Sequence, residues 1–118
     1  MSIATVFEVQ EKIRRLAIKI VKHYRGKGPE NVKVNLDGAG KVTVEIKGIL
    51  SNLSEILVKE GATDLVKQYW NVLQPYLERE FMQEAADTVG GPFTYSWTIS
   101  HDRQGERAII IELNKRFD

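Results

Sequence analysis

The chain has 118 residues, enough for one domain with its own hydrophobic core, and we predict a single domain over residues 1–118. Hydrophobic residues make up 42% of the chain and charged residues 28%, which is typical of a folded globular protein and argues against disorder. The net charge is only +1, and the absence of cysteine excludes disulfides and thiolate metal sites.

The N-terminal residues and the hydropathy suggest a location. Residues 1–9 lack the basic n-region of a signal peptide, and no apolar run approaches the length that crosses a bilayer. We therefore expect a cytoplasmic protein with no membrane span. The charge is uneven, because residues 1–27 hold seven cations against two carboxylates and the remainder holds ten cations and fourteen carboxylates. Such a basic segment can attract anions or pair with an acidic surface of its own chain.

Residues 3–24 show apolar side chains at helical spacing, with most of the cations at the other positions. This pattern predicts an amphipathic helix of about six turns with one stripe for the core. Its last turn is basic, which suits the negative end of the helix dipole. Gly26 is the expected left-handed C-cap, and Pro29 prevents the helix from resuming.

Two stretches, residues 32–36 and 42–46, alternate apolar and polar side chains. Period two with one apolar face predicts two strands, and the Asp-Gly-Ala-Gly sequence at 37–40 between them is typical of a turn. We therefore predict an antiparallel hairpin with one buried face. Gly48 ends the second strand.

A short helix is expected after Gly48, capped by Ser51 or Ser54 and ended by Gly61. Its predicted apolar side consists of Leu50, Leu53, Ile56 and Leu57.

Another helix is expected from Thr63 or Asp64, either of which would cap it. Its apolar residues are Leu65, Val66, Tyr69, Val72 and Leu73. Pro75 interrupts the pattern, so we expect a bend over residues 72–75, followed by helix to about residue 88. The Gly-Gly-Pro sequence at 90–92 is the predicted stop.

A second hairpin is predicted at the end of the chain, with strands over residues 93–101 and 107–113 and a turn over residues 102–105. The order is therefore α-β-β-α-α-β-β. Two antiparallel hairpins packed against amphipathic helices predict an α+β fold, a two-layer sandwich.

Patterns typical of catalysis or metal binding are missing from the sequence. His23 and His101 are the only histidines, and neither belongs to an HExxH motif or has a ligand at the i+4 spacing. The serines lie outside any GxSxG motif. Glu80 and Glu84 are one helical turn apart, but a solvated helix face explains them without a metal. We predict a protein that is not an enzyme, with no catalytic residues, metal or cofactor.

A basic stripe is predicted on the first helix, because Lys12, Arg15, Lys19 and Lys22 are three or four residues apart and share one face. We take these four residues, with Arg25 and Lys27, as candidate contacts for an anion or a partner. Nucleic acid and a membrane surface are alternatives. The pI of 8.0 and the lack of an RNP-like aromatic set argue against the first. The lack of flanking Trp or Phe argues against the second.

The glycine loop at residues 25–29 suggests a further alternative, a sensor of anions or small ligands. Its glycines expose backbone N–H groups, and Lys27 adds charge. However, the loop lacks the Walker spacing and follows a helix, whose C-terminal dipole opposes anion binding. We favour a structural role for it.

Trp70 is a candidate interface residue. Tyr69 and Trp70 point about 100° apart on a helix, so one of them is expected to leave the core. We select Trp70 as a partly exposed anchor, with core packing as the alternative.

The chain resembles the MpsC-like family, a small bacterial family named for a membrane-potential-generating system. The resemblance rests on the sequence RGKGPENV at 25–32, on VEIKGILS at 44–51 with Glu55 and Leu57, and on residues 98–111. The family has no established catalytic residues to transfer. The resemblance implies an accessory or interaction module, a regulatory partner of membrane ion or bicarbonate machinery. We expect a homo-oligomer, with a dimer favoured, that docks on a membrane-protein partner through sheet edges or the basic helix.

Overall fold

The computed structural model describes residues 3–37, 40–90, 93–101 and 107–115. The elements are α1 (Ile3–Arg25), β1 (Asn31–Leu36), β2 (Lys41–Lys47), α2 (Asn52–Lys59), α3 (Thr63–Val89), β3 (Phe93–His101) and β4 (Arg107–Lys115). The predicted order and the α+β class are confirmed. Three predicted turns or stops fall on residues 38–39, 91–92 and 102–106, which lie outside the described residues.

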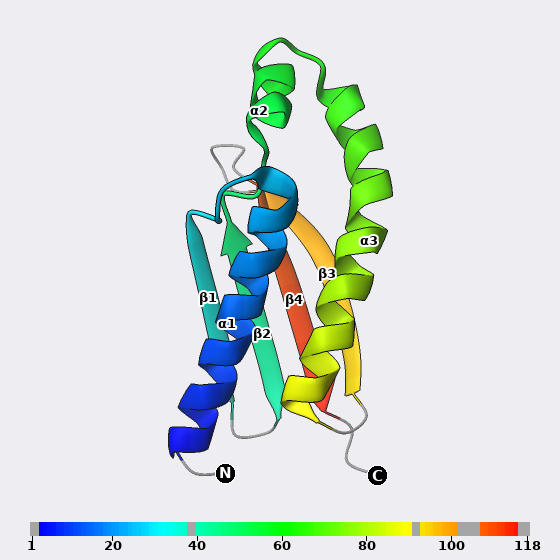
Figure 1. Cartoon of the computed structure of the whole chain (residues 1–118). Helices are drawn as coiled ribbons and strands as arrows, with labels where there is room; N and C mark the ends of the chain where they lie inside the picture. Colours follow the sequence, from blue (N-terminus) through cyan, green and yellow to red (C-terminus); the bar gives the residue numbers. More distant parts are fainter. Residues whose placement is uncertain (1–2, 38–39, 91–92, 102–106, 116–118) are drawn as a thin grey trace.

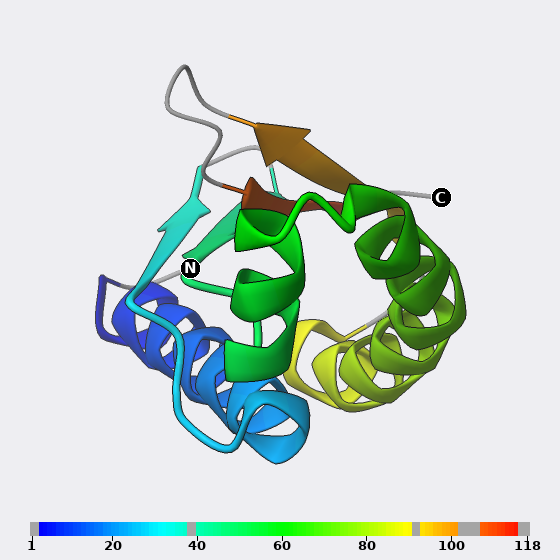
Figure 2. The same cartoon turned by 90° about the horizontal axis from the view of Figure 1, so that it is seen from above.

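The four strands form one antiparallel sheet in the order β1-β2-β4-β3. The two hairpins therefore meet through β2 and β4, where Val44 lies opposite Ile111. The helices cover one face of this sheet, so the molecule has two layers (Figures 1 and 2). The alternation of apolar residues directs one side of each strand at the helices. The fully buried strand residues on that side include Val42, Val44, Ile46, Ile109, Ile111 and Leu113.

The long helix α1 ends as its sequence predicts. Gly26 has a φ of +82°. Its N–H donates to the Lys22 carbonyl at 2.9 Å. This left-handed residue satisfies one of the last carbonyls of the helix and turns the chain toward β1. The core side of α1 is formed by Ile13, Leu16, Ala17 and Val21, all of them buried.

The two later helices begin differently. Ser51 caps α2, because its side chain accepts a hydrogen bond from the Ser54 N–H at 3.2 Å. The predicted side-chain cap on α3 is wrong, since Ala62 occupies the cap position and makes no such bond. α3 continues through Pro75 without a break, and it is bowed rather than divided into two helices (Figure 1).

Candidate functional site in the groove between α1 and α3

A groove of about 510 Å³ opens between α1 and α3. Ile20, Tyr76 and Leu77 supply its apolar surface. Lys19, Lys22 and His23 lie along its α1 side, and Glu80 and Glu84 along its α3 side. The groove thus combines an apolar lining with a basic edge and an acidic edge.

The residues of the basic stripe do not all lie at the groove. Lys19 pairs with Glu84 of α3 at 3.1 Å, so part of it meets an acidic surface of the same chain. Arg15 contacts Glu11 within α1 at 3.3 Å. Lys12 is exposed and is not part of the groove lining. Only Lys19 and Lys22 of the predicted set come together in the groove.

Next to the groove, α3 carries an exposed apolar stripe. Its four residues are spaced by four, three and four positions, so they share one helix face. We call this set the α3 stripe: Leu65 (53% exposed), Tyr69 (41%), Val72 (78%) and Tyr76 (40%). Tyr76 belongs to both the stripe and the groove lining, which makes the two surfaces continuous. On α2, the predicted core residues Leu53 and Ile56 are also exposed, at 66% and 55%.

Trp70 does not belong to this exposed surface. It is only 8% exposed, so the prediction that it leaves the core was wrong, and its neighbour Tyr69 is the residue that points outward. The Trp70 ring makes edge-to-face contacts with Tyr24 at 5.8 Å and with Tyr69 at 6.4 Å. The contact with Tyr24 joins α1 and α3. The Trp70 Nε1 group has no hydrogen-bond partner among the described residues.

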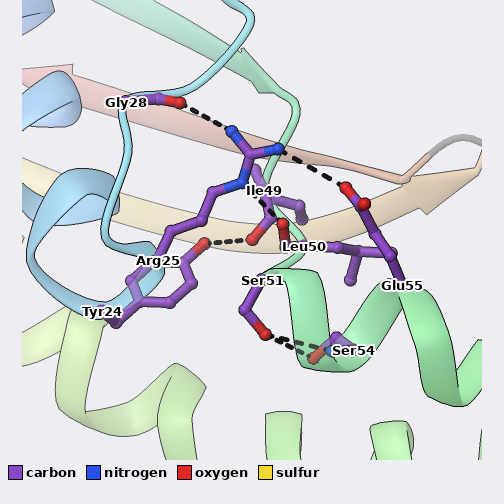
Figure 3. A network of polar contacts seen from close by, with 8 residues as sticks. All are labelled: Tyr24, Arg25, Gly28, Ile49, Leu50, Ser51, Ser54 and Glu55. Carbon is purple, nitrogen blue, oxygen red and sulfur yellow. Dashed lines mark hydrogen bonds and ion pairs between the residues drawn. The ribbon is translucent and has the colours of Figure 1, made fainter.

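Arg25 is not available to an anion either. Its side chain is 3% exposed, and its guanidinium reaches three segments of the chain (Figure 3). Nε donates to the Leu50 carbonyl at 2.5 Å and Nη1 to the Gly28 carbonyl at 2.6 Å. Nη2 lies 3.6 Å from the Glu55 carboxylate on α2. Arg25 therefore fastens the end of α1 to the glycine loop and to the start of α2, and its predicted role as an anion contact is contradicted.

The glycine loop at residues 25–29 is held by a hydrogen bond within the chain. Because the Gly28 carbonyl oxygen accepts a bond from Arg25, it is already engaged inside the molecule. Lys27 is the exposed cation of the loop. This arrangement supports the structural role over the anion sensor.

Tyr24 makes a second link between α1 and the segment after β2. Its hydroxyl donates to the Ile49 carbonyl at 2.6 Å (Figure 3). Burial raises the pKa of Tyr24 above its ordinary value, and the nearby Tyr69 raises it further, while Arg25 lowers it. The hydroxyl is therefore held as a neutral donor.

Sequence reasoning missed several residues of this site. Ile20, Tyr76 and Leu77 all lie within the segments predicted as helices, and no feature of the sequence marked them as groove residues. A usable signal was present in the breadth of the apolar pattern on α3, which is wider than one core stripe requires. Whether the extra residues face solvent depends on where α1 packs.

Among the described residues, no group of three or more His, Asp or Glu side chains is placed to hold a metal ion. None of the described helices has the length and apolar character needed to cross a membrane.

Comparison with known proteins gives one result. A family model described as "Na+-translocating membrane potential-generating system (MpsC)" matches residues 5–115, nearly the whole chain. Curated proteins gave no match. Solved structures also gave none.

Proposed function

This chain belongs to the MpsC family, and we propose that it is a non-catalytic interaction module that binds an amphipathic helix of a protein partner in a membrane-potential system. The binding surface is the α1–α3 groove together with the α3 stripe. In this proposal the protein acts in the cytoplasm as an accessory or regulatory component, and the partner performs the ion translocation.

The observation that carries the proposal is the exposure of the α3 stripe. Four apolar side chains at 40–78% exposure follow one face of α3, and the neighbouring face, about 100° around the helix, already fills the core. A second apolar face on such a helix has no role in the core, and contiguous exposed apolar surface marks interaction sites. Residues 68–77 contain no charged side chain, and two tyrosines lie among them. Loss of charge and enrichment in tyrosine are features of interface centres.

The shape and charge of the surface favour a helix as the partner. An amphipathic helix docks by placing apolar side chains one turn apart into a groove. Here the apolar lining of the groove lies between Lys19 and Lys22 on one side and Glu80 on the other. We therefore expect a partner helix with acidic residues along the α1 side and basic residues along the α3 side.

The ion pair across the groove does not prevent this binding. Lys19 and Glu84 are 69% and 47% exposed in their side chains, and such an exposed pair contributes little to stability. When a partner helix binds, Lys19 and Glu84 can each form an ion pair with an oppositely charged residue of that helix instead of with each other.

Photo-crosslinking in cells that produce the protein tests the proposal. A photoreactive amino acid replaces Val72, the most exposed residue of the stripe, and a matched probe replaces Lys33, which is exposed on β1. We expect the probe at 72, but not the probe at 33, to give one adduct whose crosslinked peptide is an amphipathic helix of a membrane-system protein. Equal labelling from both positions, or an adduct only with a second copy of the chain, would overturn it.

A Tyr76→Glu variant that also carries the probe at position 72 tests whether the crosslinked partner contacts the stripe and the groove. This change puts a carboxylate on the shared edge of stripe and groove, and we expect it to suppress the adduct. An adduct of undiminished yield would place the contact outside this surface.

A further inference from the structure

Among the described residues, no segment pairs with the outer edge of β3. β3 is the last strand in the sheet order and is nine residues long, which corresponds to about 30 Å. Residues 93–100 contain no charged residue and no proline. Edge strands present unpaired N–H and C=O groups, and proteins commonly block such edges with charge, proline or short length. β3 shows none of these devices.

The opposite edge differs from β3 in length and in charge. β1 has only six residues, and Lys33 is exposed in its middle. A lysine on a short edge strand opposes pairing with another chain. The sheet therefore has one guarded edge and one open edge.

The apolar side of β3 is less buried than the same side of β4. On β4, Ile109, Ile111 and Leu113 are fully buried, whereas their β3 partners Ile99, Trp97 and Tyr95 are partly or largely exposed. Tyr95 is 46% exposed, although Glu78 of α3 lies near enough to raise the pKa of its hydroxyl. This difference is expected where another strand is missing beside β3.

We infer that β3 is a dimerisation strand, which pairs antiparallel with β3 of a second copy around a two-fold axis at Trp97. In this register Ser96 lies opposite Thr98 of the second copy, and Tyr95 opposite its Ile99. Small hydroxyl side chains thus meet on one face, and apolar side chains meet on the other. Over residues 94–100, hydroxyl side chains lie opposite hydroxyl side chains and apolar or aromatic side chains opposite one another, without opposed like charges.

A second copy fits this edge better than a foreign strand because the strand is complementary to itself. The two-fold axis stands perpendicular to the sheet, so the two sheets join into one and both helical layers lie on the same side. The guarded β1 edges then end the assembly at a dimer rather than a fibre. The inference rests on the edge and the side chains of β3 and not on the α3 stripe, so it is carried by a different observation from the proposed partner helix.

Light scattering or sedimentation equilibrium over a range of concentrations tests the inference. We expect the wild-type chain, of 13.4 kDa, to form dimers at micromolar concentrations. Ser96→Lys with Thr98→Lys places four lysines around the axis and should weaken the dimer at least tenfold. The matched control, Asn31→Lys with Asn35→Lys, changes two exposed residues of β1 and should leave the dimer intact. Equal melting temperatures for the two double variants show that both remain folded.

Introduced cysteines test the register, and the cysteine-free chain gives no background. Directly opposed residues lie within disulfide reach, whereas diagonal neighbours lie at 7–8 Å, near the limit. We expect Ser96→Cys with Thr98→Cys to form an interchain disulfide on mild oxidation, and each single variant to form much less. A wild-type chain that stays monomeric at about 200 μM, or a dimer that survives the lysines on β3, would overturn the inference.

Discussion

Arg25 joins segments that are far apart in the sequence. Its guanidinium has donors in a fixed planar fork, and here separate nitrogens serve the Leu50 carbonyl, the Gly28 carbonyl and Glu55. A lysine has one compact ammonium and cannot reach all three directions. The buried position of Arg25 therefore depends on arginine specifically and not on positive charge alone.

We predict that Arg25→Ala lowers the free energy of unfolding by about 2–4 kcal/mol, because two carbonyl oxygens lose a charged donor. Urea denaturation measures the change. Arg25→Lys should recover only a small part of it. Lys27→Ala removes an exposed cation two residues away and is the control, for which we expect no measurable change. Equal losses for Arg25→Ala and Lys27→Ala would show that the buried contacts contribute nothing.

Tyr24 makes the stability sensitive to alkaline pH. The pKa of its hydroxyl is higher in the folded state than the ordinary value of about 10, so the folded state holds a proton that the unfolded state loses. Stability from this group is complete below pH 10 and falls as the pH rises from 10 toward the folded-state pKa.

We predict that Tyr24→Phe is less stable than wild type by about 1 kcal/mol at pH 8, because it lacks the hydrogen bond to the Ile49 carbonyl. The difference should shrink by roughly 1 kcal/mol by pH 11, since phenylalanine does not titrate. Urea denaturation at both pH values gives the comparison. Parallel pH profiles for the two proteins would contradict the assignment.

At the scale of whole elements, two glycines end elements for different reasons. Gly26 after α1 and Gly48 after β2 both have a left-handed φ, +82° and +74°. A Cβ at Gly26 would meet nothing within 4 Å. A Cβ at Gly48 would lie 2.6 Å from the Glu30 nitrogen. This nitrogen cannot withdraw freely, because it is bonded to the Lys47 carbonyl.

We therefore predict that Gly26→Ala costs about 1–2 kcal/mol of unfolding free energy, the strain of the left-handed backbone alone. Gly48→Ala should cost about 3 kcal/mol or more, because overpacking adds to the same strain. Chemical denaturation of the pair separates the two effects. Similar losses in both variants would mean that the Glu30 contact relaxes freely.

The boundaries of most elements were predictable because their signals are local. Period-two alternation specified both hairpins, and Gly26 with Pro29 specified the end of α1. The burial on α3 was not predictable, since Val66 and Leu65 are adjacent apolar residues, and only the position of α1 decides which of them faces the core. The burial of Trp70 was not predictable for the same reason, because its neighbour Tyr69 is also aromatic and the sequence does not decide which of the two faces the core. Arg25 was misassigned because its acceptors, Gly28 and Leu50, come close only after the sheet has formed.

At the scale of the whole molecule, two uncovered surfaces coexist. Helix α3, which carries the stripe, belongs to the helical layer, and β3 is the last strand of the sheet (Figures 1 and 2). Because they involve different elements, a dimer through β3 would leave the stripe available to a partner helix. We therefore expect mutations in the α3 stripe to leave dimerisation unchanged, and mutations in β3 to leave binding of the partner helix unchanged.

We predict that Leu65→Ser with Val72→Ser leaves the melting temperature almost unchanged, since both side chains are more than half exposed. The same variant should bind less of an apolar dye such as anilinonaphthalene sulfonate. Leu77→Ala, at 1% exposure, is the contrasting core variant and should cost about 2–5 kcal/mol. Marked destabilisation by the serine pair would show that the stripe contributes to the core.

The two tryptophans give the molecule a pair of internal optical probes. Trp70 contacts Tyr24 at one end of the helical layer, and Trp97 contacts Phe81 at 5.9 Å above the sheet edge. Because both indole nitrogens are shielded from water, each ring should emit toward the blue in the folded chain. A Trp97→Phe variant would then report by fluorescence on the joint between α1 and α3. A Trp70→Phe variant would report on β3, so that occupation of the groove and pairing of the strand can be followed separately in two single-tryptophan variants.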